Sequence, residues 1–404
     1  MIPSYDSFDW FSSLIPALVV LIPLLAAVRV GFGRRAVFVV IGLYLLALVA
    51  PRLALLHLAF WVTTAIMQPI VAITGERRRG SWVLWAALTI TLAPMVAWKL
   101  WPIDFVIDIN VWGNLVFRNT SDLVEAIDFT APIVAPIGLS FSAFRAADLL
   151  IKTNLGLVDR LTPGRVLGYG LFPPLLVVGP IASYDETRTT LEQHVSLTRE
   201  RTLLGALQIL SGLFKVFVIA YLLSWSTDIF DVFDDNSVWR IWGSLIAFTW
   251  FFYANFDGYS DLAIGAGRLL GADLRPNFDS PYTKTTPADF WNSWHISLTR
   301  FLRTNVFTAI VGRRPQRQYA ATVVTMLLIG LWHSVTWASA VFGVYHAIFL
   351  LGHRAIGRRR PPSEAAAWRF LKPALVFGWF GLSLPLLQLD LSGAIDFYGA
   401  MIGI

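Results

Sequence analysis

A strongly polar segment, FWNSWHISLTRFLR, occupies residues 290–303 of an otherwise hydrophobic chain. Its polar side chains recur at steps of three, four and four residues: Asn292, His295, Thr299 and Arg303. Residues three and four apart share a face of a helix, so we expect one continuous helix with a polar stripe. Pro287 would start that helix, and Thr285 or Thr286 would cap it. An interfacial amphipathic helix is the alternative, but it leaves the histidine unexplained.

A second histidine, His333, interrupts the apolar stretch 319–351, YAATVVTMLLIGLWHSVTWASAVFGVYHAIFLL. Ionisable groups inside a membrane are costly to bury and usually face a cavity, so we favour a functional role for a buried His333 over a structural one. A neutral imidazole titrates at about pH 6.5, and dehydration keeps it uncharged. His333 would therefore suit general-base catalysis, in which it takes a proton from a hydroxyl that attacks an acyl carbonyl.

Other catalytic signatures are missing from the sequence. It contains neither the G-x-S-x-G elbow of serine hydrolases nor the H-E-x-x-H pair of zinc proteases. The chain has no cysteine, which excludes disulfides, thiolate metal sites and a cysteine nucleophile. We predict no metal site. The glycines of GAGRLLG, residues 265–271, miss the dinucleotide-binding spacing and indicate close helix contact instead.

The composition is typical of a membrane protein. Of the 404 residues, 56% are hydrophobic and only 14% are charged, and the mean hydropathy is +0.62. About 20 apolar residues suffice to cross a bilayer. Such stretches occur at 11–30, 82–101, 203–227 and 371–389. We therefore predict an all-α polytopic membrane protein with about 10–12 transmembrane or re-entrant helices.

Charge distribution predicts the orientation. Clusters of arginine mark cytoplasmic loops, and they lie at 29–35, 77–79, 313–317 and 354–360. Acidic segments alternate with them at the N-terminus, 104–128 and 228–235 and would lie outside. The N-terminus carries no basic residue, so we expect no cleaved signal peptide and a retained Met1. The net charge of +6 follows from this bias. The sequence shows no basic face of a soluble domain, so it does not predict nucleic-acid binding.

Prolines break the pattern in the middle of the chain, at positions 132, 136, 163, 173, 174 and 180. Broken helices at membrane depth are tolerated when buried in protein or lining a wet cavity. We therefore expect re-entrant pieces at 131–182 and 256–310. No internal repeat is visible. We treat 1–404 as one membrane domain, made of N-terminal helices (1–130), a core (131–350) and a C-terminal helix (367–390), with a linker-like stretch at 356–366.

Five blocks in order resemble conserved segments of the membrane-bound O-acyltransferase family, in particular its bacterial branch of alginate O-acetylation and D-alanyl transfer proteins. They are PIGLSFSAFRAADLL (136–150), FPPLLVVGPIASYDE (172–186), FYANFDGYSDLAIGAGRLLGADLRPNFDSPY (252–282), FWNSWHISLTRFLR (290–303) and MLLIGLWHSVTWASAVFGVYHA (326–347). The resemblance implies a helical bundle around a membrane-crossing cavity. It implies that a donor acyl group enters from the cytoplasm, and that an acceptor and a partner enzyme lie outside.

The resemblance also assigns residues. His333 falls on the family's catalytic histidine and His295 on its second conserved polar position. We expect donor or substrate binding by Asn292, Trp294, Thr299, Arg303, Trp332 and Ser334. Arg300 and Arg303 either offer charge to a phosphate-bearing donor or snorkel to the interface. The donor would be acyl-CoA or the phosphopantetheine thioester of an acyl-carrier protein, with no permanently bound cofactor.

Some positions depart from the family pattern. Ser334 replaces a usual glycine, Arg145 a usual glutamine and Lys152 a usual aspartate. The stretch after 302–307 lacks the continuation of the alginate type, and its short connector looks closer to the D-alanyl transfer type. These departures leave donor identity and partner docking open.

Three residues outside the two histidine segments have competing interpretations. Asp257 and Asp261 either line a donor pocket or fix the fold, for which we consider a pairing with Arg268. We favour the structural role. We expect His346, in the second arm of the 319–351 hairpin, to be a packing or hydrogen-bonded residue.

Our main hypothesis is an inner-membrane O-acyltransferase that moves an acyl group, most plausibly acetyl, to a hydroxyl of an extracytoplasmic polysaccharide or partner. His333 would be the general base, with His295 positioning or relaying. The runner-up is D-alanyl transfer to a cell-wall polymer. A transporter or flippase, which also uses broken helices, and a non-catalytic membrane scaffold are the alternatives from other classes.

Overall fold

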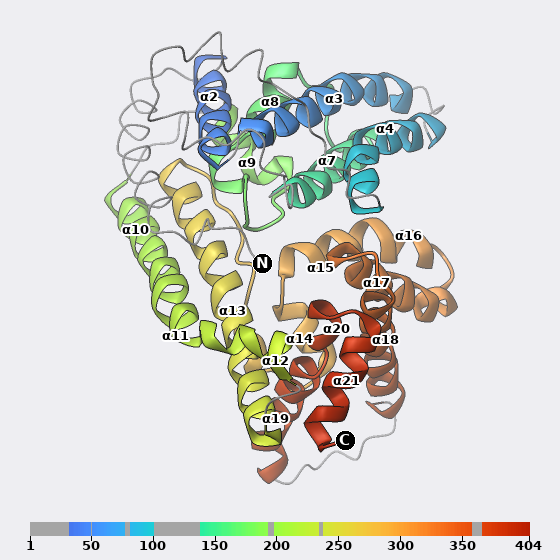
Figure 1. Cartoon of the computed structure of the whole chain (residues 1–404). Coiled ribbons are helices and arrows are strands. Elements are labelled where there is room, and N and C mark those ends of the chain that lie inside the picture. Colours follow the sequence, from blue (N-terminus) through green and yellow to red (C-terminus); the bar gives the residue numbers. More distant parts are fainter. Residues whose placement is uncertain are drawn as a thin grey trace. The chain divides into compact units, whose positions relative to one another are not determined.

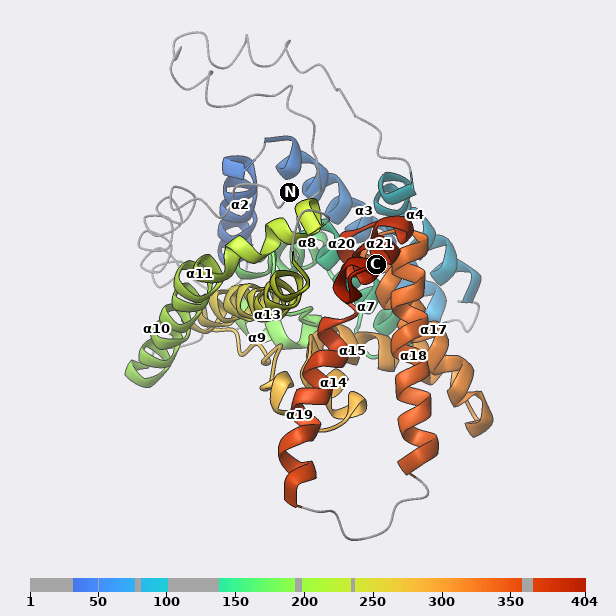
Figure 2. The same cartoon turned by 60° about the horizontal axis from the view of Figure 1, so that its bottom comes forward.

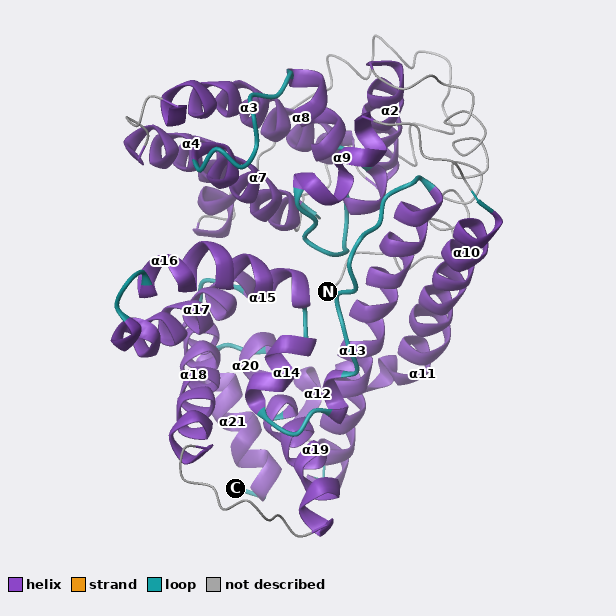
Figure 3. Cartoon of the chain, turned by 180° about the vertical axis from the view of Figure 1, so that it is seen from behind, coloured by secondary structure: helices purple, strands orange, loops and turns teal. Residues whose placement is uncertain are grey.

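The computed structural model describes residues 32–49, 51–76, 81–100, 138–192, 198–233, 237–357 and 366–404 (Figure 1). The predicted span 11–30, the acidic stretch 104–128 and most of the linker 356–366 lie outside these residues. Throughout the described residues the secondary structure is helix joined by loops, with no strand (Figure 3). The chain divides into two compact units, residues 1–206 with 266–274, and residues 207–265 with 275–404.

The first unit is built on the long helix α3 (Pro51–Glu76), which packs against the helices around it (Figure 1). Those helices are α2 (Phe32–Val49), α4 (Ser81–Leu100), α7 (Leu139–Asn154) and α8 (Pro163–Gly170). A short 3-10 turn, Pro173–Leu175, and α9 (Tyr184–Glu192) follow. The prolines start these short pieces, because Pro163 and Pro173 each occupy a first helical position, where no N–H is needed. The predicted broken stretch is confirmed over 138–182.

A buried arginine holds the centre of this unit. Arg145, on α7, has no exposed surface, and its guanidinium donates to the carbonyl oxygens of Gly170 at 3.3 Å, Leu175 at 3.2 Å and Tyr169. The ring of Trp61 lies 5.3 Å from the guanidinium carbon. A Cβ on Gly170 would come within 2.1 Å of that indole. Only glycine therefore lets the end of α8 lie this close to the Trp61 side chain of α3.

The second unit begins with an unusually long helical path. The helix α10 (Arg199–Phe214) starts in the first unit and continues through a π-helix at Lys215–Ala220 into α11 (Tyr221–Leu223), a 3-10 turn (Ser224–Asp228) and α12 (Ile229–Val232). Next to it runs α13 (Val238–Leu269), 32 residues long. At Gly212 a Cβ would lie 2.7 Å from the carbonyl oxygen of Gly258, so these two helices touch through their backbones.

The remaining elements of this unit are shorter. They are a 3-10 turn (Pro281–Thr283), α14 (Pro287–Ser293), α15 (Ile296–Leu302), a π-helix (Arg303–Phe307), α16 (Thr308–Val311), a 3-10 turn (Pro315–Arg317), α17 (Gln318–His333), α18 (Trp337–Gly357), α19 (Ala366–Gly381), α20 (Pro385–Gln388) and α21 (Leu391–Ile402). Figure 2 shows α17 and α18 side by side. A Cβ on Gly330 would lie 2.0 Å from the carbonyl oxygen of Ser339, so this hairpin is packed backbone to backbone.

The prediction of one C-terminal helix over 367–390 is wrong. The helix α19 ends at Gly381, and α20 begins at Pro385. Proline has no N–H to continue the helical ladder, so a new helix starts there. The hydroxyl of Ser383 donates to the carbonyl oxygen of Phe380 at 2.6 Å and satisfies one carbonyl at the break. The chain then forms α21, which the sequence analysis did not predict.

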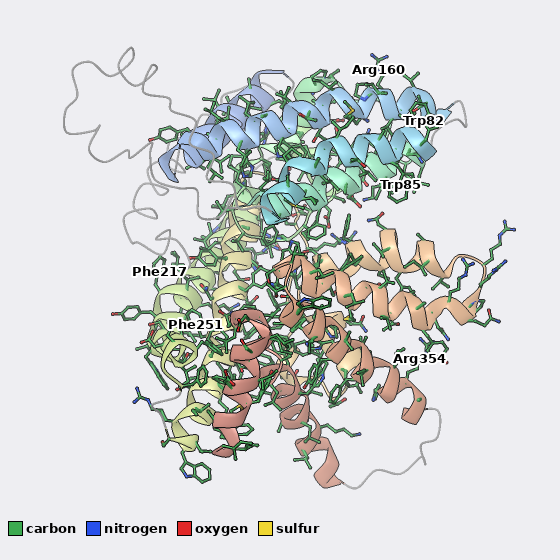
Figure 4. All side chains as sticks on the ribbon, turned by 45° about the vertical axis from the view of Figure 1, so that its right-hand side comes forward. Trp82, Trp85, Arg160, Phe217, Phe251 and Arg354 are labelled. Carbon is green, nitrogen blue, oxygen red and sulfur yellow. The ribbon has the colours of Figure 1, made fainter. Side chains whose placement is uncertain are left out.

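Several described helices suit a membrane. Two of them, Leu53–Gly75 and Arg199–Asp231, are long and apolar enough to cross one. The second contains the predicted span 203–227. The apolar part of α4, Trp82–Ala97, is shorter than the predicted span 82–101. Large apolar side chains are exposed on these helices, which in water would be costly. Trp82 and Trp85 on α4 point away from the neighbouring helices (Figure 4).

Candidate active site

The polar segment 290–303 is not the single helix that its spacing predicts. It breaks between α14 and α15, and His295 adopts a left-handed backbone with φ of 43°. Residues 277–279 cause the break by binding the backbone on both sides of it. The N–H of Asp279 donates to the carbonyl oxygen of Ser293 at 3.0 Å, and the N–H of Ile296 donates to that of Asn277 at 2.8 Å. A positive φ at a non-glycine residue is uncommon and often marks a functional position.

The start of the segment is as predicted. Pro287 is the first residue of α14, and the Thr286 hydroxyl accepts a hydrogen bond from the N–H of Asp289 at 3.1 Å. Thr286 is therefore the cap, which confirms one of the two candidates. The prediction of one continuous helix fails in its middle, between Ser293 and Ile296, because the competing hydrogen bonds come from residues 277–279.

His295 is buried, with 3% of its surface exposed, and is held by Asn277. Its Nδ1 lies 3.1 Å from the Asn277 side-chain oxygen, which also accepts from the backbone N–H of Ser297 at 3.2 Å and its hydroxyl at 2.8 Å. The ring of Phe256 packs against the imidazole, with 4.7 Å between centroids. Asn277 was missed by the sequence analysis, although it belongs to the NFDSPY part of the third conserved-looking block.

Trp332 joins the two histidines. Its ring centroid lies 5.9 Å from that of His295 and 4.6 Å from that of His333. The structure therefore brings together the two imidazoles that the sequence analysis singled out, with one indole in contact with both.

His333 is exposed, so the prediction that it is buried is wrong. It is the last residue of α17, and the chain leaves helical geometry at Ser334. Small residues such as Gly330 and Ser339 fill the close contact between α17 and α18 before His333 is reached. The imidazole lies beside Trp332 and near Phe342 of α18, with 6.2 Å between the centroids of the His333 and Phe342 rings.

The other predicted site residues take different positions. Arg303 donates to the side-chain oxygen of Asn292, so two members of the predicted polar stripe meet despite the break. Trp294 is buried in an aromatic cluster, where its ring stacks on Phe290 at 5.5 Å between centroids. The Thr299 hydroxyl donates to the carbonyl oxygen of Trp294 at 3.4 Å.

Ser334 shapes the turn that follows His333. Its hydroxyl oxygen lies 2.6 Å from that of Ser339 and 3.2 Å from that of Thr336. A serine is therefore accommodated at this position through local hydrogen bonds, which a glycine could not make.

The two aspartates of FDGYSD have a structural partner that the sequence analysis did not name. The ammonium of Lys215 lies 2.7 Å from Asp257 and 2.6 Å from Asp261. Asp261 also accepts from Gln208 at 2.7 Å and from Ser211 at 2.9 Å. These bonds join α13 to α10 and to the π-helix that follows it, and the partner is Lys215 in place of the Arg268 that the sequence suggests.

His346 is a structural residue, as predicted. It has no exposed surface, and its Nε2 lies 3.0 Å from the Ser383 hydroxyl. The rings of Phe342, Trp291 and Trp379 surround it at 4.3, 5.1 and 4.7 Å between centroids.

Known proteins with similar sequences carry names that refer to alginate, peptidoglycan or teichoic acid. A protein of Azotobacter vinelandii described as a probable alginate O-acetylase is 30% identical over 293 residues, 68% of this chain and 58% of the relative. A peptidoglycan O-acetyltransferase of Helicobacter pylori is 29% identical over 247 residues, 59% of this chain and 47% of the relative. A teichoic acid D-alanyltransferase of Streptococcus thermophilus is 26% identical over 257 residues, 58% of this chain and 60% of the relative.

The chain spans less than two thirds of the length of each of these three relatives. A model of the family of membrane-bound O-acyltransferases matches residues 156–384, which contain His295, His333 and Asn277. Because that match extends over more than half of the chain, the protein belongs to the membrane-bound O-acyltransferase family.

Proposed function

We propose that this protein transfers an acyl group, most plausibly acetyl, from a cytoplasmic thioester donor to a hydroxyl of an extracytoplasmic polysaccharide or of a partner protein. The observation that carries the proposal is the meeting of two imidazoles on one indole, with His295 held by Asn277 and His333 exposed. Family membership and the alginate and peptidoglycan relatives support the acyl-transfer chemistry.

The proposed reaction uses one histidine as the base and a second, fixed histidine beside it. His333 takes the proton of the acceptor hydroxyl while that oxygen attacks the thioester carbonyl carbon. A new C–O bond forms, the C–S bond breaks, and the departing thiolate receives a proton, so that the imidazole is regenerated. His295 positions the reacting groups or relays the proton. The exposure of His333 at the end of α17 supports this role, because a buried ring could not reach two substrates.

The donor would be acetyl-CoA or the phosphopantetheine thioester of a carrier protein. Arg303, which is exposed and contacts Asn292, would offer charge to the donor's phosphate. We place the protein in the cytoplasmic membrane as a multi-pass protein, with a partner enzyme on the outer side. D-alanyl transfer from a carrier protein is the second candidate, and the Streptococcus thermophilus relative supports it.

The test is transfer by the purified protein in proteoliposomes, with radiolabelled acetyl-CoA and, separately, with an acylated carrier protein. We expect His333→Ala to lower kcat by about 100-fold or more, because general-base catalysis contributes about 10²–10⁴-fold. His353→Ala, which changes a histidine near the far end of α18, is the matched control and should leave kcat unchanged. Undiminished transfer by His333→Ala would refute the base role. Absence of transfer from both donors, together with solute flux across the vesicles, would favour transport.

A further inference from the structure

The two ends of the Asn277 amide have separate partners. The side-chain oxygen receives three contacts: the N–H of Ser297 at 3.2 Å, the hydroxyl of Ser297 at 2.8 Å and Nδ1 of His295 at 3.1 Å. The side-chain nitrogen donates to the hydroxyl of Ser260 on α13 at 3.1 Å. Asn277 itself is 1% exposed. An amide so surrounded cannot rotate without losing several hydrogen bonds.

These contacts identify which amide atom faces the histidine. A backbone N–H can only donate, so the atom of Asn277 that meets Ser297 N–H must be the oxygen. The Ser260 hydroxyl at the other end fits the amide nitrogen. A carbonyl oxygen carries no hydrogen and can only accept. The Ser297 hydroxyl lies 2.8 Å from this oxygen and 3.5 Å from Nδ1 of His295, so its hydrogen points to Asn277, and Nδ1 is the second donor to the same oxygen. In a neutral ring the lone pair then lies on Nε2.

Asn277 also holds the backbone at this point. Its carbonyl oxygen accepts from the N–H of Ile296 at 2.8 Å, and its side chain accepts from the N–H of Ser297. Both N–H groups belong to the first turn of α15, where a helix has no acceptors of its own. One residue thereby caps α15 from outside and holds His295 in its left-handed conformation.

We propose that Asn277 is a positioning residue that holds His295 as the Nδ1–H tautomer, so that Nε2 is the ring nitrogen available to accept a proton or a hydrogen bond during acyl transfer. The role in turnover rests on the function proposed above, whereas the tautomer itself does not. The oxygen of Asn277 acts on the reaction through His295 and touches no substrate.

The tautomer is tested by NMR of protein with ¹⁵N-labelled histidine rings. The chain has only six histidines, so the His295 signals are assigned by their loss in His295→Gln. We expect the Nδ1–H tautomer in the wild type and a shift toward Nε2–H, the form favoured in water, in Asn277→Leu. An Nε2–H ring in the wild type would overturn the proposal, whether or not any acyl transfer is detected.

The kinetic test compares three variants in the proteoliposome assay. We expect Asn277→Leu to lower kcat about 10- to 100-fold, because Nε2 of His295 then carries the hydrogen and can no longer accept one. KM should change less than about threefold, because the side chains proposed to bind substrate are unchanged. Asn277→Asp keeps an acceptor at the same place and should restore most of kcat. Its added negative charge favours the imidazolium, so the acid limb of the kcat–pH profile should move to higher pH.

Ser383→Ala is the matched control, because it removes the hydrogen bond of another fully buried histidine, His346, outside the site. It should change the His346 NMR signals and leave kcat within about twofold. Wild-type kcat in Asn277→Leu, or a pH profile that Asn277→Asp does not move, would contradict the positioning role. If the wild-type protein shows no acyl transfer, the proposed function is refuted. The NMR result would still decide the tautomer of His295.

Discussion

Some buried polar side chains of the described residues have several specific partners. Arg145 shows this most clearly, because its partners are carbonyl oxygens of residues 169, 170 and 175 and the rings of Trp61 and Tyr169. Tyr169 and Gly170 are the last residues of α8, and Leu175 ends the 3-10 turn that follows; carbonyls at such ends have no N–H partner within the helix. The guanidinium thus replaces the backbone donors that a helix would have provided.

We expect Arg145→Met to lower the free energy of unfolding by about 2–4 kcal/mol, because buried carbonyls lose their donor. Arg145→Gln, which restores the residue type more common in the family, should cost less because its amide still donates. Thermal unfolding in detergent, followed by tryptophan fluorescence, measures the loss. Arg160→Met, at an exposed arginine labelled in Figure 4, is the control and should be neutral. A fully stable Arg145→Met protein would show that the carbonyls have other donors.

At the scale of elements, close backbone contact between helices positions the site. The hairpin of α17 and α18 ends at His333 and depends on glycines at two facing positions. A Cβ on Gly330 would lie 2.0 Å from the Ser339 carbonyl oxygen, and one on Gly343 would lie 2.7 Å from the Leu327 Cα. In both cases the obstructing atom belongs to the backbone, which cannot move aside as a side chain can. The backbones of α17 and α18 can therefore lie this close only because both positions lack a side chain.

We predict that Gly330→Ala forces α17 and α18 apart, destabilises the protein by about 1–3 kcal/mol and lowers acyl transfer. The matched control is Gly352→Ala, also in the hairpin, where a Cβ meets nothing within 4 Å. That change should be neutral or stabilising by about 0.5–1 kcal/mol, because alanine favours helix more than glycine does. Unfolding temperature and kcat are measured together. Equal behaviour of the two variants would contradict the close-contact explanation.

At the scale of the whole molecule, orientation in the membrane decides from which side each substrate arrives. The arginine-rich turn at 313–317 predicts a cytoplasmic position, and the acidic segment 228–235 predicts an outer one. Residues Arg313, Arg314 and Arg317 are exposed on the structure, and so is Ser237 beside the acidic segment. These positions are therefore open to chemical labelling from the side that they face.

The absence of cysteine makes orientation measurable with single substitutions. We expect Ser237→Cys to react with a membrane-impermeant maleimide in intact spheroplasts, and Arg314→Cys to react only after lysis. The unmodified protein should stay unlabelled, and labelling of Arg314→Cys after lysis shows that the thiol is reactive. The opposite pattern would reverse the orientation and place the entrance of the donor on the outer side.

Features determined by a few neighbouring residues were predictable from the sequence. The all-helical membrane class follows from composition. The helix start at Pro287 and the breaks in the chain around Pro163 and Pro173 follow from the missing N–H of proline. The cap at Thr286 follows from its hydroxyl, and the pairing of the two histidine segments in one site follows from the family resemblance.

Tertiary structure alone decided which buried polar groups meet. Asn277 binds His295 from 18 residues away. It thereby interrupts the continuous helix that the spacing of polar residues in 290–303 predicts. Lys215 binds Asp257 and Asp261 from 42 and 46 residues away. His333 is exposed, although the sequence on both sides of it is apolar. Local patterns report how a segment hydrogen-bonds within itself, whereas a competing partner from a distant segment acts only once the chain has folded.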